Sequence, residues 1–572
     1  MDNFSLALAL YELADLLELR GEDPFKIRAY RKAAQALEQL PEEASAIAAR
    51  AGAAGLMALP GVGKAIAEKL IELLTTGRLQ KLEELRTALP PGLKELVAVP
   101  GLGAHTASLL FSRLGVASLD DLELAARQGR LRDLPGFGPR KEQQVLARLP
   151  AVRQRLTRTS SAALLPLARA LAAALAAQPG IQRAEVAGSL RRGCDMAADI
   201  DLLVAAGDPT ALAAALPLLN VLRSFEAVAP DHWRAESSRG HKIDVYITQP
   251  VSFGAAWLWA TGSQRHLEDL TARASAGGLR LGSDGLWRSD GSLAAAAEEA
   301  EVYAALGLDP VPPELREGEG EVELAAAGAL PRLITAADLR GDLHTHTRAS
   351  DGTATVAEMG QAAADLGYAY LAITDHSPLV RVTNGLDPER LAAQRAEVRR
   401  LGRVGSATLL HGCEVDIRQD GSLDLPDEAL AALDVVVASV HMRYGQDETA
   451  MTERVCRALE SGYVHILGHP TGRLVGGRDP FDLDLDRVFA LAAERGVALE
   501  MSADPARLDL SGELARRANQ AGCLFAIDTD AHATASLGEV GWGVLQARRA
   551  GLTATDVINC LELADLQAWL KR

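Results

Sequence analysis

The sequence has few cysteines and no long uninterrupted apolar segment. Its five cysteines are scattered through 572 residues without a Cys-x-x-Cys pair, which argues against a disulfide framework and against a thiolate zinc site. The most apolar stretch, residues 162–177, is mainly alanine and contains Arg169, so it predicts a helix of a soluble protein and not a membrane span. No basic segment and cleavage site frame the N-terminus, so we expect no signal peptide and no membrane partner.

The chain also lacks an overall excess of positive charge. Its net charge of −17 argues against nucleic-acid binding, because affinity for DNA comes largely from neutralising phosphates. The charge is uneven, however: residues 1–150 have a net charge of 0, residues 151–316 of −2 and residues 317–572 of −15. The first two parts can therefore still present a basic face to DNA.

Length and pattern predict several folded domains. At roughly 100–200 residues per domain, the chain corresponds to three or four domains. The pattern is helical before residue 150 and mixed between 160 and 310, and prolines followed by acidic residues mark a break at 310–338. From residue 340, short apolar segments alternate with helical stretches, which favours an α/β domain with polar residues at the carboxyl ends of its strands.

One short phrase recurs three times in the helical region: LPGVGK at 59–64, VPGLGA at 99–104 and LPGFGP at 134–139. The two glycines permit positive φ and leave backbone amides uncovered at the start of the next helix, where they can hold a phosphate. A single copy would more often be an ordinary turn, but three copies favour DNA binding. The phrases resemble helix-hairpin-helix motifs, which implies sequence-independent DNA contact, with a monovalent cation, at Gly61, Gly63, Lys64, Gly101, Gly103, Gly136 and Gly138.

Three aspartates lie in two strand-like segments of the middle region. Asp199 and Asp201 are two residues apart in DIDLLVAA, so an extended strand points both carboxylates to one face, and Asp244 in KIDVYIT has similar apolar neighbours. For the first segment alone, an ordinary half-exposed strand is the more frequent explanation. Carboxylates that meet need cations, and oxygen ligands suit Mg²⁺ or Mn²⁺ bridging to phosphates. Two such ions can stabilise the attacking and the leaving oxygen of a phosphoryl displacement.

The segment GSLRRG at 188–193 lies just before the first two aspartates. A glycine turn, a hydroxyl and two guanidiniums can grip a triphosphate opposite a metal-binding wall. Together the segments resemble the GS-x-RRG and D-x-D signature of the DNA polymerase X family. The resemblance implies that Asp199 and Asp201 bind both ions and that Asp244 helps activate the primer 3′-hydroxyl. It also implies a dNTP site at Gly188, Ser189, Arg192, Thr261, Gly262 and Ser263.

Some positions depart from the family pattern. Trp259 and Ala260 stand in place of an aromatic pair, Leu267 in place of a polar minor-groove asparagine, and Lys242 in place of an arginine beside the third acid. These changes bear on sugar discrimination and fidelity, whereas the metal-binding acids are unchanged.

The segment PFKIRAYRKAA at 24–34 resembles the lyase-type domain of the same family. Lys69 matches its Schiff-base lysine, and Lys26 and Tyr30 fall near its phosphate pocket, but Met57 and Ala65 replace two basic residues of that pocket. Two interpretations of Lys69 stay open, a lyase nucleophile and a charge that faces DNA.

Eight of the twelve histidines lie between residues 344 and 532, in the acidic part of the chain. Mixed imidazole and carboxylate ligands without thiolate suit Zn²⁺, Mn²⁺ or Fe²⁺, although any one of these histidines alone would more often be structural. Nine histidines and acids form an ordered set: His344, His346, Asp351, His376, Glu414, His441, His469, Asp530 and His532. The set resembles that of the polymerase and histidinol phosphatase (PHP) family, a distorted barrel that hydrolyses phosphoesters with up to three ions, and the resemblance implies that all nine are metal ligands. His411 and His465 fall outside the pattern, and Ser502 replaces an asparagine that is not a ligand.

These resemblances cover nearly the whole chain and are those of bacterial family X DNA polymerases fused to a PHP domain. They imply a multidomain protein of α+β and α/β class, with a helical helix-hairpin-helix region, a nucleotidyltransferase palm and a distorted (β/α) barrel of PHP type. The expected divisions are a lyase-type domain at 1–90, a fingers-like domain at 91–155, a palm and thumb at 156–316, a linker at 317–339 and the PHP domain at 340–572.

The leading hypothesis is a DNA repair polymerase that fills short gaps in gapped or nicked duplexes with dNTPs. Its PHP domain would act on 3′ ends as a 3′-5′ exonuclease or 3′-phosphatase. We expect a cytoplasmic, bacterial monomer that is nucleoid-associated when bound to DNA. Two alternatives are a DNA-end-binding protein whose polymerase site is weak or silent, and a small-molecule phosphatase, which leaves the three hairpins unexplained.

Overall fold

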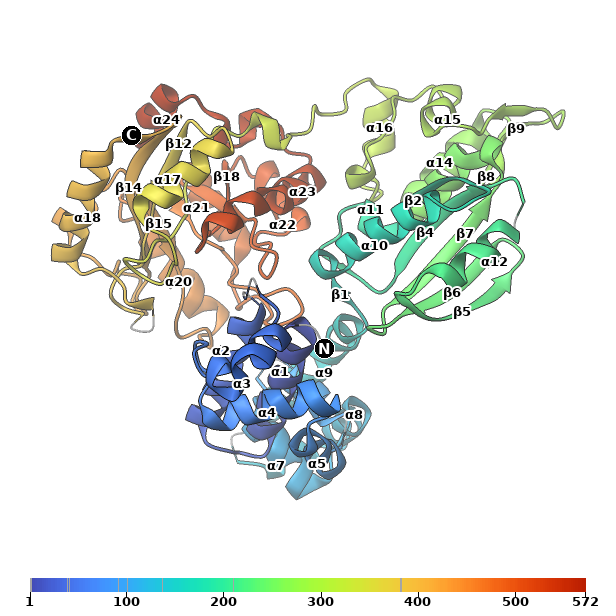
Figure 1. Ribbon diagram of the computed structural model, residues 1–572. Helices are drawn as coiled ribbons and strands as arrows, with labels where there is room; N and C mark the ends of the chain where they lie inside the picture. Colours follow the sequence, from blue (N-terminus) through green and yellow to red (C-terminus); the bar gives the residue numbers. More distant parts are fainter. Residues whose placement is uncertain are drawn as a thin grey trace. The chain divides into compact units, whose positions relative to one another are not determined.

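A computed structural model describes residues 3–38, 40, 42–90, 92–99, 101–135, 137–208, 210–380 and 383–571. The chain divides into two compact units, residues 1–157 and 158–572 (Figure 1). In the described part of the chain, no helix is both long enough and apolar enough to cross a membrane.

The first unit is helical throughout its described residues. Its helices bury apolar residues at helical spacing, as in α4, where Ile66, Leu70 and Leu73 face the core. The helices are α1 (Asn3–Leu19), α2 (Pro24–Glu38), α3 (Ala44–Leu56), α4 (Lys64–Thr76), α5 (Gln80–Ala88), α6 (Leu93–Val97), α7 (Ala104–Leu114), α8 (Leu119–Arg127), the 3₁₀ helix η1 (Arg130–Asp133) and α9 (Pro139–Leu156).

The three recurring phrases form three similar turns. In each, the apolar residue between the glycines is buried, and its amide donates to the carbonyl three residues earlier: Val62 to Leu59, Leu102 to Val99, and Phe137 to Leu134. Gly61 and Gly101 have φ values of +79° and +83°, which explains the first glycine of each of those turns. The third turn follows a 3₁₀ helix instead of an α-helix, and Gly136 lies outside the described residues.

The second unit begins with the short strand β1 (Thr159–Ser160), which pairs with β3 (Met196–Ala197). Helix α10 (Ser161–Ala176) follows and packs on a five-stranded sheet in the order β2-β4-β7-β6-β5. The strands are β2 (Ile181–Val186), β4 (Ile200–Ala206), β5 (Leu222–Ala229), β6 (His232–Ser237) and β7 (Lys242–Thr248), and the short helix α11 (Gly188–Arg191) connects toward β4. The central strands β4 and β7 are parallel, and their register sets Asp201 opposite Asp244. Both predicted aspartate segments are therefore neighbouring strands.

Helices α13 (Phe253–Thr261) and α14 (Gln264–Ala276) follow the sheet, with a small antiparallel sheet formed by β8 (Leu279–Gly282), β9 (Gly285–Arg288) and β10 (Leu293–Ala295). Helices α15 (Glu299–Ala305) and α16 (Glu321–Ala326) come next. The start of α15 is tied to α11, because Glu299 accepts two hydrogen bonds from Arg191 and two from the buried Arg316, all between 2.7 and 3.0 Å.

These ion pairs predict an acid-sensitive fold. Burial favours protonation of Glu299, but Arg191 and Arg316 outweigh it and lower the pKa of Glu299 to about 2. The stabilisation from these ion pairs is therefore complete above the ordinary glutamate pKa and is lost as the pH falls toward 2. We expect Glu299→Gln to lower the free energy of unfolding by about 3 kcal/mol at pH 7 and by much less near pH 3. Urea unfolding followed by tryptophan fluorescence measures this, with the exposed Glu323→Gln as control; equal losses at both pH values would contradict it.

The last region is a nearly closed parallel barrel with the order β11-β12-β14-β15-β16-β17-β18. An isolated parallel bridge between Thr345 and Ala531 joins its two ends. The strands are β11 (Gly341–Asp342), β12 (Tyr370–Ile373), β14 (Ala407–Asp416), β15 (Val435–Ser439), β16 (Ile466–Leu467), β17 (Ala498–Ser502) and β18 (Phe525–Asp528). Each of the short apolar segments predicted from residue 340 onward overlaps one of these strands, and the predicted fold class is confirmed.

Helices cover the outside of the barrel. They include α17 (Val356–Asp365), α18 (Pro388–Leu401), α20 (Glu448–Leu459), α21 (Leu485–Arg495), α22 (Gly512–Gln520), α23 (Val540–Ala550) and α24 (Leu563–Leu570). The interior is filled by apolar side chains such as Tyr370, Val437 and Ile466. Polar residues therefore collect at the carboxyl ends of the strands and in the loops that follow them.

Candidate active sites

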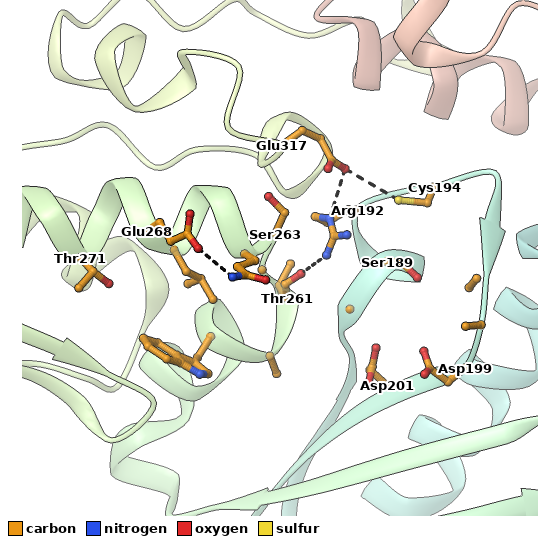
Figure 2. Close-up of a pocket in the computed structure, with 18 of the residues that line it drawn as sticks. Ser189, Arg192, Cys194, Asp199, Asp201, Thr261, Ser263, Glu268, Thr271 and Glu317 are labelled. Atoms are coloured by element: carbon orange, nitrogen blue, oxygen red, sulfur yellow. Dashed lines mark hydrogen bonds and ion pairs between the residues drawn. The ribbon is translucent and has the colours of Figure 1, made fainter. Parts of the chain in front are cut away.

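The three predicted catalytic aspartates lie together at one end of the five-stranded sheet. Asp199 directly precedes β4, Asp201 is in β4, and Asp244 faces Asp201 across the parallel ladder. The carboxylates of Asp199 and Asp201 lie side by side and point toward the loop with Ser189 and Arg192 (Figure 2). All three are only partly exposed.

Like charge and burial act together on these acids. Burial, followed by the charges of Asp199 and Asp244, raises the pKa of Asp201 to about 7, and burial and Asp244 also raise the pKa of Asp199. A cation placed between the carboxylates would relieve this repulsion, so the donor set fits divalent metal ions.

A cleft of about 1070 Å³ adjoins these acids. Its lining includes Asp199 and Asp201 as well as the six residues predicted to bind a nucleotide: Gly188, Ser189, Arg192, Thr261, Gly262 and Ser263. Gly188 has a φ of +59°, and a Cβ there would lie 1.9 Å from a carboxylate oxygen of Asp201, so any larger residue would displace the acid. Asp244 lines a second cavity of about 700 Å³ together with Asp199. Asp199 therefore borders both cavities.

The two arginines of the RRG segment have different surroundings. Arg191 is not part of the cleft lining: it pairs with Glu299 and lies over the ring of Trp257, 3.3 Å from the ring centroid. Arg192 faces the cleft, where it donates to the carbonyl of Thr261 and pairs with Glu317 at 3.2 Å. Glu317 was not predicted, because it lies 125 residues from Arg192 in a segment that reads as a linker.

Asp244 has a partner that the sequence analysis missed. The Nε2 atom of His232, on the neighbouring strand β6, lies 2.6 Å from its carboxylate, and the imidazole stacks on Tyr246. The departures from the family pattern also lie near the acids: Trp259 and Leu267 line the 1070 Å³ cleft, and Lys242 lines the 700 Å³ cavity.

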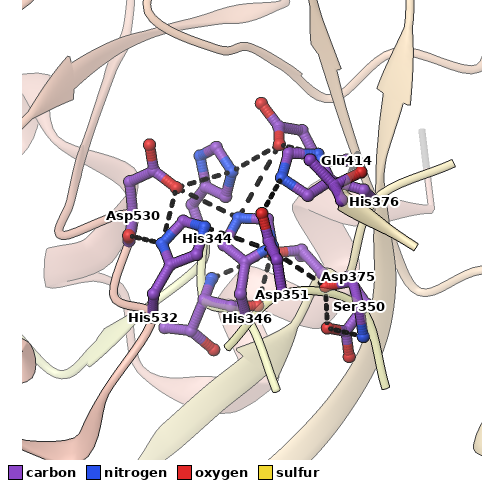
Figure 3. Close-up of polar contacts among 12 residues, drawn as sticks. His344, His346, Ser350, Asp351, Asp375, His376, Glu414, Asp530 and His532 are labelled. Atoms are coloured by element: carbon purple, nitrogen blue, oxygen red, sulfur yellow. Dashed lines mark hydrogen bonds and ion pairs between the residues drawn. The ribbon is translucent and has the colours of Figure 1, made fainter. Parts of the chain in front are cut away.

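The nine histidine, aspartate and glutamate residues predicted as metal ligands converge at the end of the barrel. Glu414 lies at the centre, with its carboxylate 2.8 to 3.7 Å from nitrogen atoms of His344, His346, His376, His441 and His469. Figure 3 shows the rings of His344, His346, His376 and His532 turned toward Asp351, Glu414 and Asp530. Three overlapping groups can each hold one ion: His346, Asp351, His376 and His532; His344, His346 and Asp530; and His376, Glu414 and His441.

Several features of this cluster fit bound metal ions. Buried atoms of His344, His346, Glu414 and Asp530 have no partner in hydrogen-bond geometry among the described residues. Asp530 and His469 have φ values of +52° and +25°, an unfavourable backbone conformation that persists where the surroundings enforce it. An imidazole and carboxylate set without cysteine suits Zn²⁺, Mn²⁺ or Fe²⁺.

Charges within the cluster are strongly coupled. Burial disfavours charged imidazoles, but Glu414 and neighbouring carboxylates outweigh it and raise the pKa of His376 and of His441 to about 10. Burial instead lowers the pKa of His469 to about 3. Metal ions bind neutral imidazoles, so loading the cluster displaces protons.

Two further acids orient histidines of the predicted ligand set. Glu500 accepts from His344 Nδ1 at 2.6 Å and from the amide of His469, and Asp416 lies 3.0 Å from His441 Nδ1. Such contacts fix ring orientation and tautomer. Asp416 could have been found from the sequence, because it lies two residues after Glu414 on the same face of β14. Ser502, His411 and His465 lie outside the cluster, and His465 contacts the backbone of Val436 and Leu570.

The predicted DNA-binding residues lie in the first unit. Gly63, Lys64 and Gly103 are exposed at the starts of α4 and α7, where no side chain caps the amides, and Gly138 precedes α9. Lys69 is half-buried on α4 and donates to the carbonyl of Ala65 at 3.3 Å. Lys26 pairs with Glu22, and Tyr30 is 3% exposed. The roles of Lys26, Tyr30 and Lys69 stay predictions.

An aspartate triad beside an open cleft and a buried imidazole and carboxylate cluster in a barrel define an enzyme class, that of metal-dependent phosphoester chemistry. Sequence comparisons agree by region: a helix-hairpin-helix domain matches residues 1–79, a SAM-like helix-hairpin-helix tandem 93–149, a DNA polymerase beta thumb 256–317 and a PHP domain 342–503.

One relative matches the chain from end to end. The DNA polymerase/3′-5′ exonuclease PolX of Bacillus subtilis strain 168 is 35% identical over 567 residues, which is 98% of each chain. The chain therefore belongs to the family X DNA polymerases that carry a PHP domain.

Other relatives match the barrel alone. A protein named "Probable phosphatase" from Thermoanaerobacter sp. strain X514 is 27% identical over 241 residues, 40% of this chain and 94% of its own length. Another with that name, from Shewanella sp. strain ANA-3, is 30% identical over 207 residues, 34% of this chain and 78% of its own.

Proposed function

We propose that the chain is a DNA-directed DNA polymerase of DNA repair that fills short gaps, and that its PHP domain acts on 3′ ends as a metal-dependent 3′-5′ exonuclease or phosphoesterase. One observation is the main support for the polymerase activity in this proposal. Asp199, Asp201 and Asp244 meet at one strand end, beside a cleft that also contains Arg192.

In the polymerase site, Asp199 and Asp201 would hold two Mg²⁺ or Mn²⁺ ions, which stabilise the charge that develops on the attacking and leaving oxygens. Ser189 and Arg192 bind the triphosphate from the opposite wall of the cleft, and Thr261, Gly262 and Ser263 support the sugar and base. Asp244 accepts the proton of the primer 3′-hydroxyl. His232 orients its carboxylate, since the two groups are 2.6 Å apart.

In the barrel, the nine ligands would hold up to three Zn²⁺, Mn²⁺ or Fe²⁺ ions, which supply an acidified water and Lewis-acid stabilisation. Arg507 lies 3.5 Å from Asp530, beside the cluster, with most of its side chain buried. Its guanidinium orients a phosphate of the DNA strand toward the ligands.

The helix-hairpin-helix turns bind the DNA backbone through exposed amides at the starts of α4, α7 and α9, with a monovalent cation in the hairpins. The substrates are gapped or nicked duplexes with free 3′ ends and dNTPs, and the protein acts as a monomer at the bacterial nucleoid. The relatives that match only the barrel do not favour a small-molecule phosphatase, because they cover 40% or less of this chain.

Removal and return of metal ions tests the proposal. Asp199 and Asp201 line an open cleft and offer oxygen ligands alone, whereas the barrel set is mainly imidazole and five of its nine members are buried. Mg²⁺ alone should therefore restore extension of a gapped duplex to chelator-treated protein. Release of 3′ nucleotides should return only with Mn²⁺, Zn²⁺ or Fe²⁺. Both activities are followed on end-labelled DNA. If untreated protein adds no nucleotide with Mg²⁺ or Mn²⁺, the chain is instead a DNA-end-binding protein with PHP chemistry alone.

A further inference from the structure

The loop that follows α11, residues 192–195, is held by both the sheet and the barrel. Within the sheet region, the amide of Cys194 donates to the carbonyl of Ser189, and the amide of Ser161 donates to the carbonyl of Asp195. The barrel contributes three side chains from distant parts of the sequence. They are Arg549, which donates to the carbonyl of Arg192 at 2.7 Å, Gln546, which donates to that of Gly193 at 3.0 Å, and Arg473, which pairs with Asp195 at 2.7 Å.

These contacts are close and largely shielded from water. Gln546 is 1% exposed, and the side chains of Arg473 and Arg549 are each 14% exposed. Gly193 has a φ of +72°, and a Cβ there would lie 2.6 Å from the side chain of Leu545. Polar groups buried this way fix geometry, because a lost partner leaves a carbonyl without its hydrogen bond.

Glu317 connects Arg549 to the guanidinium of Arg192. One oxygen of Glu317 accepts from Arg192 Nε at 3.2 Å and from Arg549 Nη1 at 2.9 Å. Arg549 thus holds both the backbone of Arg192 and the carboxylate that pairs with its side chain. Without Arg549, Arg192 alone would neutralise Glu317, and a triphosphate would have to compete with that carboxylate.

We propose that the PHP barrel positions the nucleotide-binding loop of the polymerase, with Arg549 as the principal positioning residue and Gln546 as its support. The proposal rests on the proposed function, in which Arg192 binds the triphosphate. It makes nucleotide affinity depend on a helix of the barrel, α23, which contributes no residue to the lining of the nucleotide cleft and none of the catalytic aspartates.

The test is steady-state gap filling by the full-length chain. Arg549→Met should raise the KM for dNTP about 10-fold and change kcat by less than about 2-fold, because it removes a positioning contact and no catalytic group. Arg549→Lys should recover most of the affinity, since one nitrogen makes both contacts of Arg549. Gln546→Met should raise KM by about 3-fold. Arg517→Met, an exposed arginine of α22 that pairs with Asp486, is the matched control.

Exonuclease activity on single-stranded DNA separates positioning from misfolding. It should stay within about 2-fold of wild type in all four variants. An equal loss of exonuclease and polymerase activity in Arg549→Met, or a KM that stays unchanged in both Arg549→Met and Gln546→Met, would overturn the proposal. Arg192→Met distinguishes a failure of the positioning role from a failure of the proposed triphosphate-binding role. If the KM for dNTP rises in Arg192→Met but keeps its wild-type value in Arg549→Met and Gln546→Met, only the positioning role fails. If the KM is unchanged in Arg192→Met, the triphosphate role of Arg192 fails.

Discussion

Asp201→Asn should abolish nucleotide incorporation and, at the same time, stabilise the metal-free protein. The substitution keeps the shape of the side chain but removes a carboxylate that would hold metal ions, so we expect incorporation to fall by about 10³-fold or more. Gap filling with Mg²⁺ and with Mn²⁺ measures this. Exonuclease activity should be unchanged, because the barrel ligands are a separate set of side chains.

The gain in stability follows from the charge repulsion among the acids. The folded-state pKa of Asp201 is raised to about 7, so its ionisation destabilises the fold increasingly from the ordinary aspartate pKa up to pH 7. Above that pH, Asn should stabilise the metal-free protein by about 1–3 kcal/mol, and near pH 4 it should have little effect. The exposed Asp208→Asn is the matched control. Incorporation within tenfold of wild type, or a lower stability at pH 8, would contradict the assignment.

Much of the polymerase site could be predicted because its signals are local. The two-residue spacing of Asp199 and Asp201 sets their common face, and the apolar residues around Asp244 indicate a neighbouring buried strand. The contacts that hold the nucleotide loop could not be predicted. Gln546 and Gly193 are 353 residues apart, and nothing near either residue indicates the pairing.

The same contrast holds in the barrel. The histidines and acids predicted as metal ligands stand at or just after the ends of apolar segments, and parallel strands bring their carboxyl ends to one edge. Which imidazole is oriented by Glu500 or Asp416 depends on the three-dimensional approach of strands that are far apart in sequence. Likewise, Arg191 and Arg192 have different surroundings because each pairs with a glutamate from a distant segment, Glu299 and Glu317 respectively.

Glu414→Gln should lower both the metal content of the barrel and its nuclease activity. Glu414 is buried, with five imidazoles around it, and its carboxylate is the central negative charge of the cluster. An amide of the same shape cannot replace that charge, so we expect at least one equivalent of metal to be lost and exonuclease activity to fall by about 10²-fold or more. Elemental analysis of the purified protein measures the metal content independently of activity.

His411→Gln is the matched control for this variant, since His411 is a buried histidine on the same strand, three residues earlier and outside the ligand set. It should keep its full metal content and its nuclease activity. Gap filling should persist in both variants, because the loop of Arg192 contacts α23 and the segment at Arg473 but not Glu414. Full metal content in Glu414→Gln would show that the ions bind elsewhere. A joint loss of polymerase activity would show instead that the loop depends on the ions as well as on the side chains that hold it.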